Sequence, residues 1–156
     1  MDPQPAFAPP GSKTELEEGD AFTPKFGADG LIPALAICAA TREPLMLAYM
    51  NAESLRRTLE IGEAVYWSRS RGEFWHKGAS SGHVQRIVEI RTDCDQDALV
   101  LMVDQVGAGA CHTGRASCFY RRITPTSNTS GFTLESTGSG KSFDPTEVYG
   151  HRANDA

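Results

Sequence analysis

Five short apolar segments constrain the fold of this chain more than any other feature of its sequence. Each has the length and the β-branched, aromatic or alternating character of a strand; they are residues 31–38, 45–49, 64–68, 84–91 and 98–106. The polar residues 41–44 predict a hairpin turn between the first two segments. One short helix is expected after Asn51 as its N-cap, with Leu55 and Leu59 one turn apart. Gly62 is expected to end that helix, so the sequence predicts an α+β fold that is mainly β.

Length and charge exclude several classes of protein. A chain of 156 residues is typical of one domain, and it buries enough surface to fold without disulfides. The net charge is −5 with scattered Lys and Arg, which argues against a nucleic-acid partner. No apolar run approaches the roughly 20 residues of a membrane span, and the first residues lack the features of a signal peptide. We therefore expect a cytoplasmic chain that is not attached to a membrane.

Both ends of the chain differ in composition from its middle. Residues 1–30 are rich in Pro, Gly and Glu, and they predict a flexible lead-in with one short strand near residues 22–26. Residues 124–156 are rich in Ser, Thr and Gly, and they predict a mostly disordered tail. The single folded domain is therefore expected to cover residues 31–123.

Three cysteines lie among polar residues, namely Cys94, Cys111 and Cys118. Their spacing does not fit the paired C-x-x-C knuckles of a structural zinc site. Three soft ligands without an obvious fourth suit a catalytic Zn²⁺ that keeps one position for water. Buried or unrelated thiols are the alternative interpretation. Cys38 lies in an apolar segment and is interpreted as a small buried hydrophobic residue.

Three carboxylates alternate with other residues in the run Asp93-Cys94-Asp95-Gln96-Asp97. On an extended strand Asp93, Asp95 and Asp97 would share one face and Cys94 would point to the other. Such carboxylates repel one another unless a cation or basic groups neutralise them, and hard oxygen ligands suit Mg²⁺. A solvated acidic turn is the alternative. A calcium loop is disfavoured because Ala98 stands where that loop needs Gly.

Histidines, cations and aromatic residues surround these ligands in the sequence. His112 follows Cys111, and it is a candidate for a fourth ligand or for a general base. Arg115 is a candidate for binding a phosphate through its planar fork of donors. Residues 67–78 offer cations for phosphate and aromatic faces for a base. An ordinary hairpin with solvated charges is the alternative for that stretch.

Taken together, seven motifs resemble those of the phosphoribosyl-AMP cyclohydrolases of histidine biosynthesis. The motifs are MLAYMN (46–51), YWSRSR (66–71), WHKG (75–78), SGH (81–83), DCDQD (93–97), ACHTG (110–114) and SCF (117–119). The resemblance extends from Leu31 to Arg122 in one register. It implies an enzyme that opens the six-membered adenine ring of phosphoribosyl-AMP by hydrolysis between N1 and C6, with Zn²⁺ and Mg²⁺ as cofactors.

The resemblance also implies where the metals bind. It places zinc on Cys111 and Cys118, with Cys94 supplied by the partner subunit of an intertwined homodimer. It places magnesium on Asp93, Asp95 and Asp97. The fold expected with these sites is a compact, barrel-like mixed sheet.

Roles for the remaining candidates follow from this reaction. His112 is the first choice for proton transfer, with His76 and His83 in reserve. The candidates for the two phosphate groups of the substrate are Arg69, Arg71, Lys77 and Arg115, and Trp75 is a candidate for stacking on the base. A structural zinc module with four protein ligands and a thiol redox protein are the rival classes.

Overall fold

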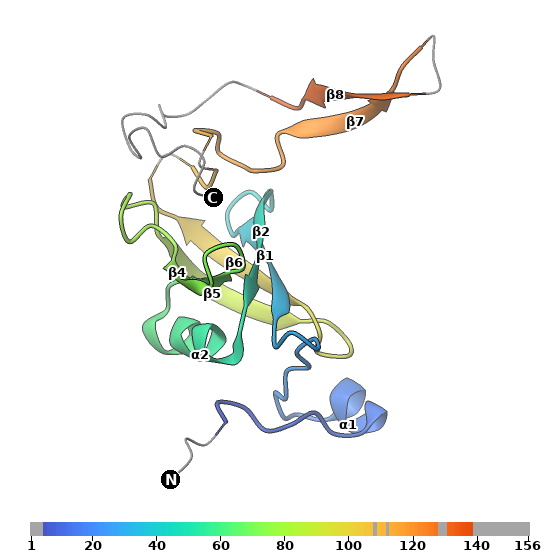
Figure 1. Cartoon of the computed structure of the whole chain (residues 1–156), viewed down its shortest axis with the longest axis vertical. Coiled ribbons are helices and arrows are strands. Elements are labelled where there is room, and N and C mark those ends of the chain that lie inside the picture. The colour runs from blue at the N-terminus through green and yellow to red at the C-terminus, as the bar shows by residue number, and fades with distance from the viewer. Residues whose placement is uncertain (1–4, 108, 112, 128–130, 139–156) are drawn as a thin grey trace.

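The computed structural model describes residues 5–107, 109–111, 113–127 and 131–138. Its elements are α1 (Lys13–Glu18), β1 (Ile32–Cys38), β2 (Pro44–Met50), α2 (Ala52–Ile61), β3 (Val65–Ser68), β4 (Glu73–His76), β5 (Gln85–Thr92), β6 (Leu99–Gln105), β7 (Arg121–Pro125) and β8 (Phe132–Ser136). A six-stranded sheet forms the body of the molecule, with α1 at one end and the β7–β8 hairpin at the other (Figure 1). Within these residues, no helix is long and apolar enough to cross a membrane.

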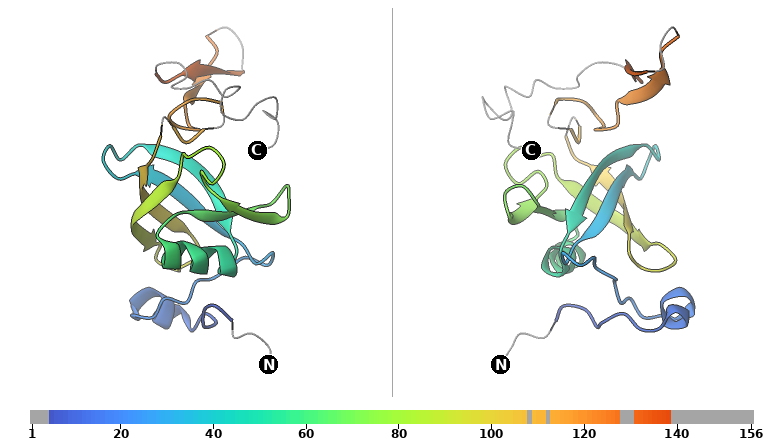
Figure 2. Two further views of the ribbon diagram at one scale, coloured as in Figure 1. Left: turned by 90° about the vertical axis from the view of Figure 1, so that its left-hand side faces the viewer. Right: turned by 45° about the vertical axis from the view of Figure 1, so that its right-hand side comes forward.

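The main sheet is mixed and strongly curled. Its strand order is β4-β3-β2-β1-β6-β5, in which β1 runs parallel to β6 and every other pair is antiparallel. The edge strand β5 also bonds to the segment just before β3. The Ala64 amide donates to the Gln85 carbonyl, and the Ile87 amide donates to the Gly62 carbonyl. Figure 2 shows that the sheet curls into a half-barrel. The expectation of a barrel-like mixed sheet is confirmed in this form.

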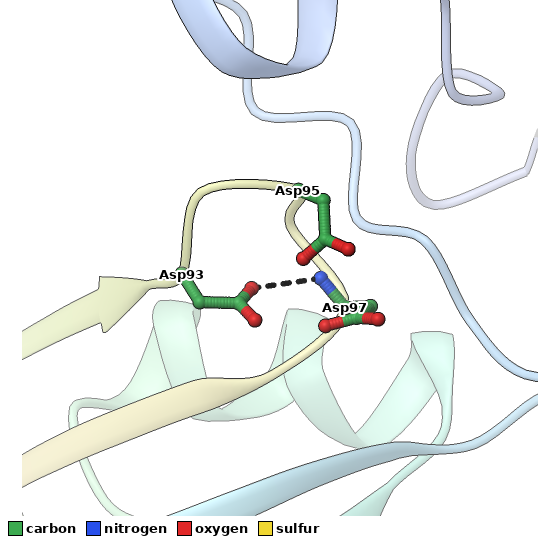
Figure 3. Close-up of side chains that lie close together, drawn as sticks. All are labelled: Asp93, Asp95 and Asp97. Atoms are coloured by element: carbon green, nitrogen blue, oxygen red, sulfur yellow. Dashed lines mark hydrogen bonds between the residues drawn. The ribbon is translucent and has the colours of Figure 1, made fainter. Parts of the chain in front are cut away.

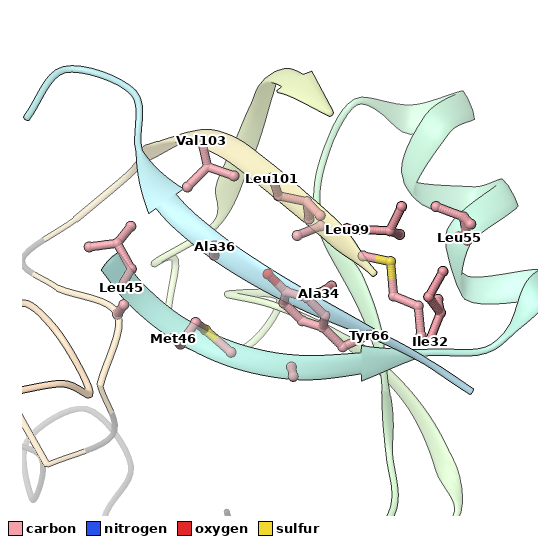
Figure 4. Close-up of a cluster of buried hydrophobic side chains, with 14 residues drawn as sticks. Ile32, Ala34, Ala36, Leu45, Met46, Leu55, Tyr66, Leu99, Leu101 and Val103 are labelled. Atoms are coloured by element: carbon pink, nitrogen blue, oxygen red, sulfur yellow. The ribbon is translucent and has the colours of Figure 1, made fainter. Parts of the chain in front are cut away.

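The hydrophobic core lies inside the curl of the sheet. Alternate residues of β1, β2 and β6 point inward, and Tyr66 of β3 and Leu55 of α2 complete the cluster (Figure 4). The buried members include Ile32, Ala34, Ala36, Met46, Ala48, Met50, Leu99, Leu101 and Val103. This period of two is why the apolar segments form strands rather than helices.

The five predicted strands and the predicted helix are confirmed with small shifts of their bounds. Asn51 caps α2, because its Oδ1 accepts from the Ser54 amide at 2.8 Å and the Ser54 hydroxyl accepts from the Asn51 amide at 2.9 Å. Gly62 ends the helix with φ +73°, a left-handed conformation that glycine adopts without a steric cost. The turn between β1 and β2 places Arg42 at φ +66°.

The N-terminal prediction is wrong in two respects. Residues 22–26 form no strand, and α1 is a second helix where only one was expected. Ser12 caps α1 through a capping box with Glu15, and this local pattern overrides the polar composition of the segment. The segment also packs on the body of the molecule, since Pro24 is fully buried and Phe26 contacts the core.

The C-terminal prediction is wrong for the described part of residues 124–138. Instead of a structureless tail, β7 and β8 form a two-stranded antiparallel hairpin that projects from the sheet (Figure 2). Ile123 lies opposite Leu134, and Pro125 opposite Phe132, so one face of the hairpin is apolar. Paired in register on the other face are Arg122 with Glu135 and Thr124 with Thr133. Residues 139–156 lie outside the described residues.

Candidate functional site

The turn between β5 and β6 brings three carboxylates together (Figure 3). One oxygen each from Asp93, Asp95 and Asp97 lies within 4.8 Å of the others. Asp93 organises the turn, because its Oδ1 accepts from the amides of Asp97 at 3.0 Å and Ala98 at 3.1 Å. The expectation of an extended strand is wrong here, since residues 94–97 form a turn. Turn formation, rather than alternation along a strand, gathers the aspartates.

The electrostatics of this turn favour a bound cation. Hydrogen bonding to Asp93 and then to Asp95 raises the pKa of Asp97 to about 6. Burial opposes ionisation of Asp93, but hydrogen bonds from Asp97 and Ala98 outweigh it and lower the pKa of Asp93. Without a cation, Asp97 therefore takes up a proton as the pH falls through about 6. Three clustered hard oxygens fit the ligand preference of Mg²⁺.

A tight loop after β6 brings together Cys111 and Cys118. The Cys111 amide donates a hydrogen bond to the Arg115 carbonyl, and the Ala110 amide donates one to the Ala116 carbonyl, so the chain folds back on itself. The Ser117 hydroxyl then donates to Pro44 at 2.6 Å, and the Cys118 amide donates to Leu45 at 2.7 Å. These bonds anchor the loop to the start of β2.

The two thiols interact directly. Hydrogen bonding with Cys111, followed by burial, raises the pKa of Cys118 well above its usual range, and the charge of Lys77 opposes this shift. The Cys111 Sγ also contacts the Thr113 hydroxyl at 2.9 Å. Two adjacent thiols that resist ionisation together are the donor set that a soft cation such as Zn²⁺ neutralises.

Lys77 lies beside this thiol pair, and His83 lies near Lys77. The Lys77 side chain is only 3% exposed, and burial lowers its pKa while the charges of Cys118 and Cys111 oppose that change. Burial and then the charge of Lys77 lower the pKa of His83. Gly78 makes this packing possible, because its φ is +85° and a Cβ there would collide with the backbone of Val84.

Cys94 is separated from the other two cysteines within one chain. It lies before β6, whereas Cys111 follows that strand, and seven extended residues span about 23 Å. Among the described residues, one group of three possible metal ligands lies close together, and it is the aspartate cluster. Cys94 does not belong to this group. Cys94 is exposed and lines a cavity of about 290 Å³ between the N-terminal segment and the turn.

The other predicted site residues have separate partners. The His76 Nε2 contacts Glu63 at 3.1 Å, and Trp75 packs against Tyr66 with ring centroids 5.6 Å apart. The three arginines also have partners. The guanidinium of Arg69 lies 3.9 Å from the ring centre of Tyr49, and that of Arg115 lies 4.0 Å from the ring centre of Tyr120. The Arg71 Nε lies 3.4 Å from Glu73 Oε1. His112 lies outside the described residues.

A buried polar network that the sequence pattern does not predict ends at the backbone of His83. The Tyr66 hydroxyl donates to Gln85 Oε1 at 2.6 Å, and the Gln85 amide donates to Gln105 Oε1 at 3.0 Å. The Gln105 amide in turn donates to the His83 carbonyl at 3.0 Å. The network therefore links three strands to the backbone of His83. A glutamine at each of two strand ends was the available signal, but the partners are 19 to 22 residues apart in sequence.

Comparisons with known proteins agree on one family. The family model described as Phosphoribosyl-AMP cyclohydrolase matches residues 46–120. A protein of that name from Rhodopseudomonas palustris is 50% identical over 90% of this chain and 93% of its own length. Another of that name from Nitrobacter winogradskyi is 53% identical over 91% of this chain and 97% of its own. A third from Hyphomonas neptunium is 57% identical over 75% of this chain and 88% of its own. The chain belongs to the phosphoribosyl-AMP cyclohydrolase family.

Proposed function

We propose that this protein opens the adenine ring of phosphoribosyl-AMP by hydrolysis of the bond between N1 and C6, a step of histidine biosynthesis. The observation that carries the proposal is the similarity, at 50% identity or more over about nine-tenths of the chain, to proteins named for this activity. The paired thiols beside a buried lysine add a site suited to metal-assisted hydrolysis.

Zinc is assigned to Cys111 and Cys118 of one subunit together with Cys94 of the partner subunit. The adjacent thiols of the first two fit this assignment because each hinders ionisation of the other. When bound, Zn²⁺ supplies an activated water by lowering its pKa toward about 7. Thiol ligands stay free of disulfides in a reducing compartment, which agrees with a cytoplasmic enzyme.

The side chains around the thiols prepare the site for an anionic substrate. Lys77 places a buried positive charge beside Cys111 and Cys118, and this charge offsets that of thiolate ligands. The Thr113 hydroxyl orients the Cys111 sulfur. His112, next to Cys111 in sequence, is assigned to move the proton to the leaving N1, because a general acid or base must lie beside the reacting atoms.

Recognition of the substrate is assigned to one aromatic and three basic side chains. Trp75, which is only partly buried, is assigned to stacking on the base. The guanidinium groups of Arg69, Arg71 and Arg115 are assigned to the phosphates, because their planar forks match phosphate oxygens. Mg²⁺ is assigned to the aspartate turn, whose three clustered carboxylates offer it hard oxygen ligands.

A homodimer is part of this proposal. Within one chain Cys94 lies a full strand away from Cys111, so a three-thiol site needs a second subunit. The β7–β8 hairpin offers a surface for that contact, since Ile123 is 73% exposed and Phe132 is 72% exposed on its apolar face. Exposed apolar patches of this kind are typical of protein interfaces.

The decisive experiment is an absorbance assay of ring opening with phosphoribosyl-AMP and purified protein. We expect turnover that a zinc chelator abolishes and that added Zn²⁺ restores. Cys111→Ala should lose bound zinc and turnover together, whereas the control Cys38→Ala should keep both. No turnover by the fully metallated protein would refute the function. Full turnover after complete zinc removal would refute the zinc assignment and leave the reaction standing.

A further inference from the structure

The N-terminal segment, residues 16–25, is bound to the aspartate turn through one residue, Gln96. Gln96 is only 4% exposed, although aspartates flank it on both sides. Its Oε1 accepts from the Thr23 amide at 2.9 Å, and its Nε2 lies 3.0 Å from the Leu16 carbonyl and 3.3 Å from the Ala21 carbonyl. The Gln96 carbonyl also accepts from the Lys25 amide at 2.7 Å. The side-chain amide thus uses its acceptor and its donors on backbone groups more than 70 residues away in the sequence.

The backbone of Gln96 is held in a conformation that disfavours a side chain. Its φ is +58°, and Arg42 is the other non-glycine residue with positive φ among those the structure describes. Glycine or asparagine is the usual choice at such a position. A glutamine there is explained if its side chain provides binding that offsets the unfavourable conformation.

We propose that Gln96 is a positioning residue, whose side chain clamps residues 16–25 against the turn and so fixes the metal-binding geometry of Asp93, Asp95 and Asp97. The inference rests on the proposed function in that it takes this turn as the Mg²⁺ site. The peptide units of Gln96 join Asp95 to Asp97 directly, so a shift of Gln96 moves two of the three carboxylates. Figure 3 shows the N-terminal segment running past this turn.

The N-terminal segment is firm enough to serve as the fixed side of the clamp. Pro24 is fully buried, and Phe26 packs on the hydrophobic core. Phe7 contacts Phe22 with ring centroids 5.5 Å apart, and it also contacts Phe26 at 6.4 Å. Because Gln96 binds only backbone atoms of the segment, composition of residues 16–25 gives no sign of this role.

Two substitutions separate the clamp from simple relief of backbone strain. Gln96→Gly relieves the positive φ and removes every side-chain contact. Gln96→Glu is nearly isosteric and keeps an acceptor for Thr23, but it sets oxygens against the carbonyls of Leu16 and Ala21. Arg42→Gly is the matched control, because Arg42 has the same backbone conformation on an exposed turn away from the aspartates.

The test uses Mn²⁺ as a hard-cation probe of the full-length protein, without substrate. We expect Gln96→Gly and Gln96→Glu to weaken Mn²⁺ binding about 10-fold or more, and to broaden the electron paramagnetic resonance lines of the bound ion. Arg42→Gly should keep both. By hydrogen exchange, the Thr23 amide should lose protection in Gln96→Gly and retain it in Gln96→Glu.

Several outcomes would overturn the clamp. Unchanged or tighter Mn²⁺ binding in Gln96→Gly would show that the glutamine only strains the turn. A Thr23 amide whose exchange is unaltered in that variant would remove the physical link. A wild-type chain that binds no Mn²⁺ would also refute the inference. Failure of ring opening in a wild-type chain that passes these tests would refute the proposed function and leave the clamp in place.

Discussion

The raised pKa of Asp97 predicts how the proposed Mg²⁺ site depends on pH. Its pKa is raised to about 6, so without metal the folded chain holds this proton more tightly than the unfolded chain. The contribution of this group to stability is therefore lost as the pH rises from about 4 through about 6. Mg²⁺ needs the deprotonated form, so we expect its affinity to fall as the pH drops through about 6. Isothermal titration calorimetry between about pH 5 and pH 7.5 measures this.

The control for this pH profile is a carboxylate outside the turn. Asp104→Asn changes an exposed acid on β6 and should leave the midpoint near pH 6. Mg²⁺ affinity that stays constant down to about pH 5 would contradict the raised pKa of Asp97.

Proton transfer provides a second prediction for single residues. His112→Ala should keep its zinc but lower kcat on the order of 10²-fold, because a general acid or base is removed. His76→Ala should change kcat little, since its imidazole contacts Glu63. Zinc analysis and steady-state kinetics on both variants decide the matter. A large loss of kcat in His76→Ala alone would transfer the assignment to that residue.

The sequence predicts that the three aspartates gather, but it does not predict the backbone conformation that brings them together. Like charges at Asp93, Asp95 and Asp97 require neutralisation wherever the chain places them, so their grouping could be inferred from the residue types. The turn itself depends on the left-handed backbone of Gln96, and glutamine carries no signal for that conformation. Its partners come from the N-terminal segment, which no local pattern connects to the turn.

At the level of elements, α2 shows what local signals determine. Its N-cap and its glycine stop are both within the segment, and they set both ends of the helix as expected. The two leucines of its sequence pattern differ, however. Leu55 is fully buried, whereas Leu59 is 50% exposed and Thr58 takes the buried position beside the Val65 backbone.

This difference predicts unequal effects on stability. Leu55→Ala should lower the free energy of unfolding by about 2–5 kcal/mol, because it leaves a cavity in the core. Leu59→Ala should change it by less than about 1 kcal/mol, because half of that side chain is already in contact with water. Urea denaturation followed by circular dichroism compares the two variants. Equal losses would show that α2 packs differently from this description.

The elements without a clear signal in the sequence are short or exposed. β4 is an edge strand of four residues without alternating burial, so its pairing with β3 leaves no periodic signal. β7 and β8 are exposed throughout or nearly so, and their composition resembles that of a loop. The capping box of α1 was readable from Ser12 and Glu15, but a helix of six residues has little periodicity.

At the level of the whole molecule, the apolar face of the β7–β8 hairpin is exposed. Within the described residues, the main sheet does not cover it. If this face forms the interface of the proposed homodimer, replacing Ile123 and Phe132 together with Glu should produce monomers, because the charges would have to be buried at the interface. Thr133→Glu lies on the polar face of the same hairpin and should leave the dimer intact. Light scattering distinguishes these outcomes. A doubly charged variant that remains dimeric would place the interface elsewhere.

For the sheet as a whole, the sequence predicts the fold class but not the order of the strands. Five strand-length segments predict a mainly β fold, and the hairpin of β1 with β2 follows from their short connection. The parallel pairing of β1 with β6 joins residues about 65 positions apart, as in Ala34 with Leu99. Such pairing joins segments far apart in the sequence and leaves no local pattern, so the strand order could not be predicted from the sequence.

Under the proposed zinc assignment, the position of β6 between Cys94 and Cys111 would make each polypeptide both a donor and a recipient of a thiol. A Cys94→Ala chain would retain an intact recipient loop, and a Cys111→Ala chain would retain an intact donor. Each should be inactive alone. After the two are unfolded, mixed and refolded, half of the dimers should carry one complete centre, restoring about one quarter of wild-type turnover. Complementation that never exceeds the background of either parent would mean that every subunit completes its own centre.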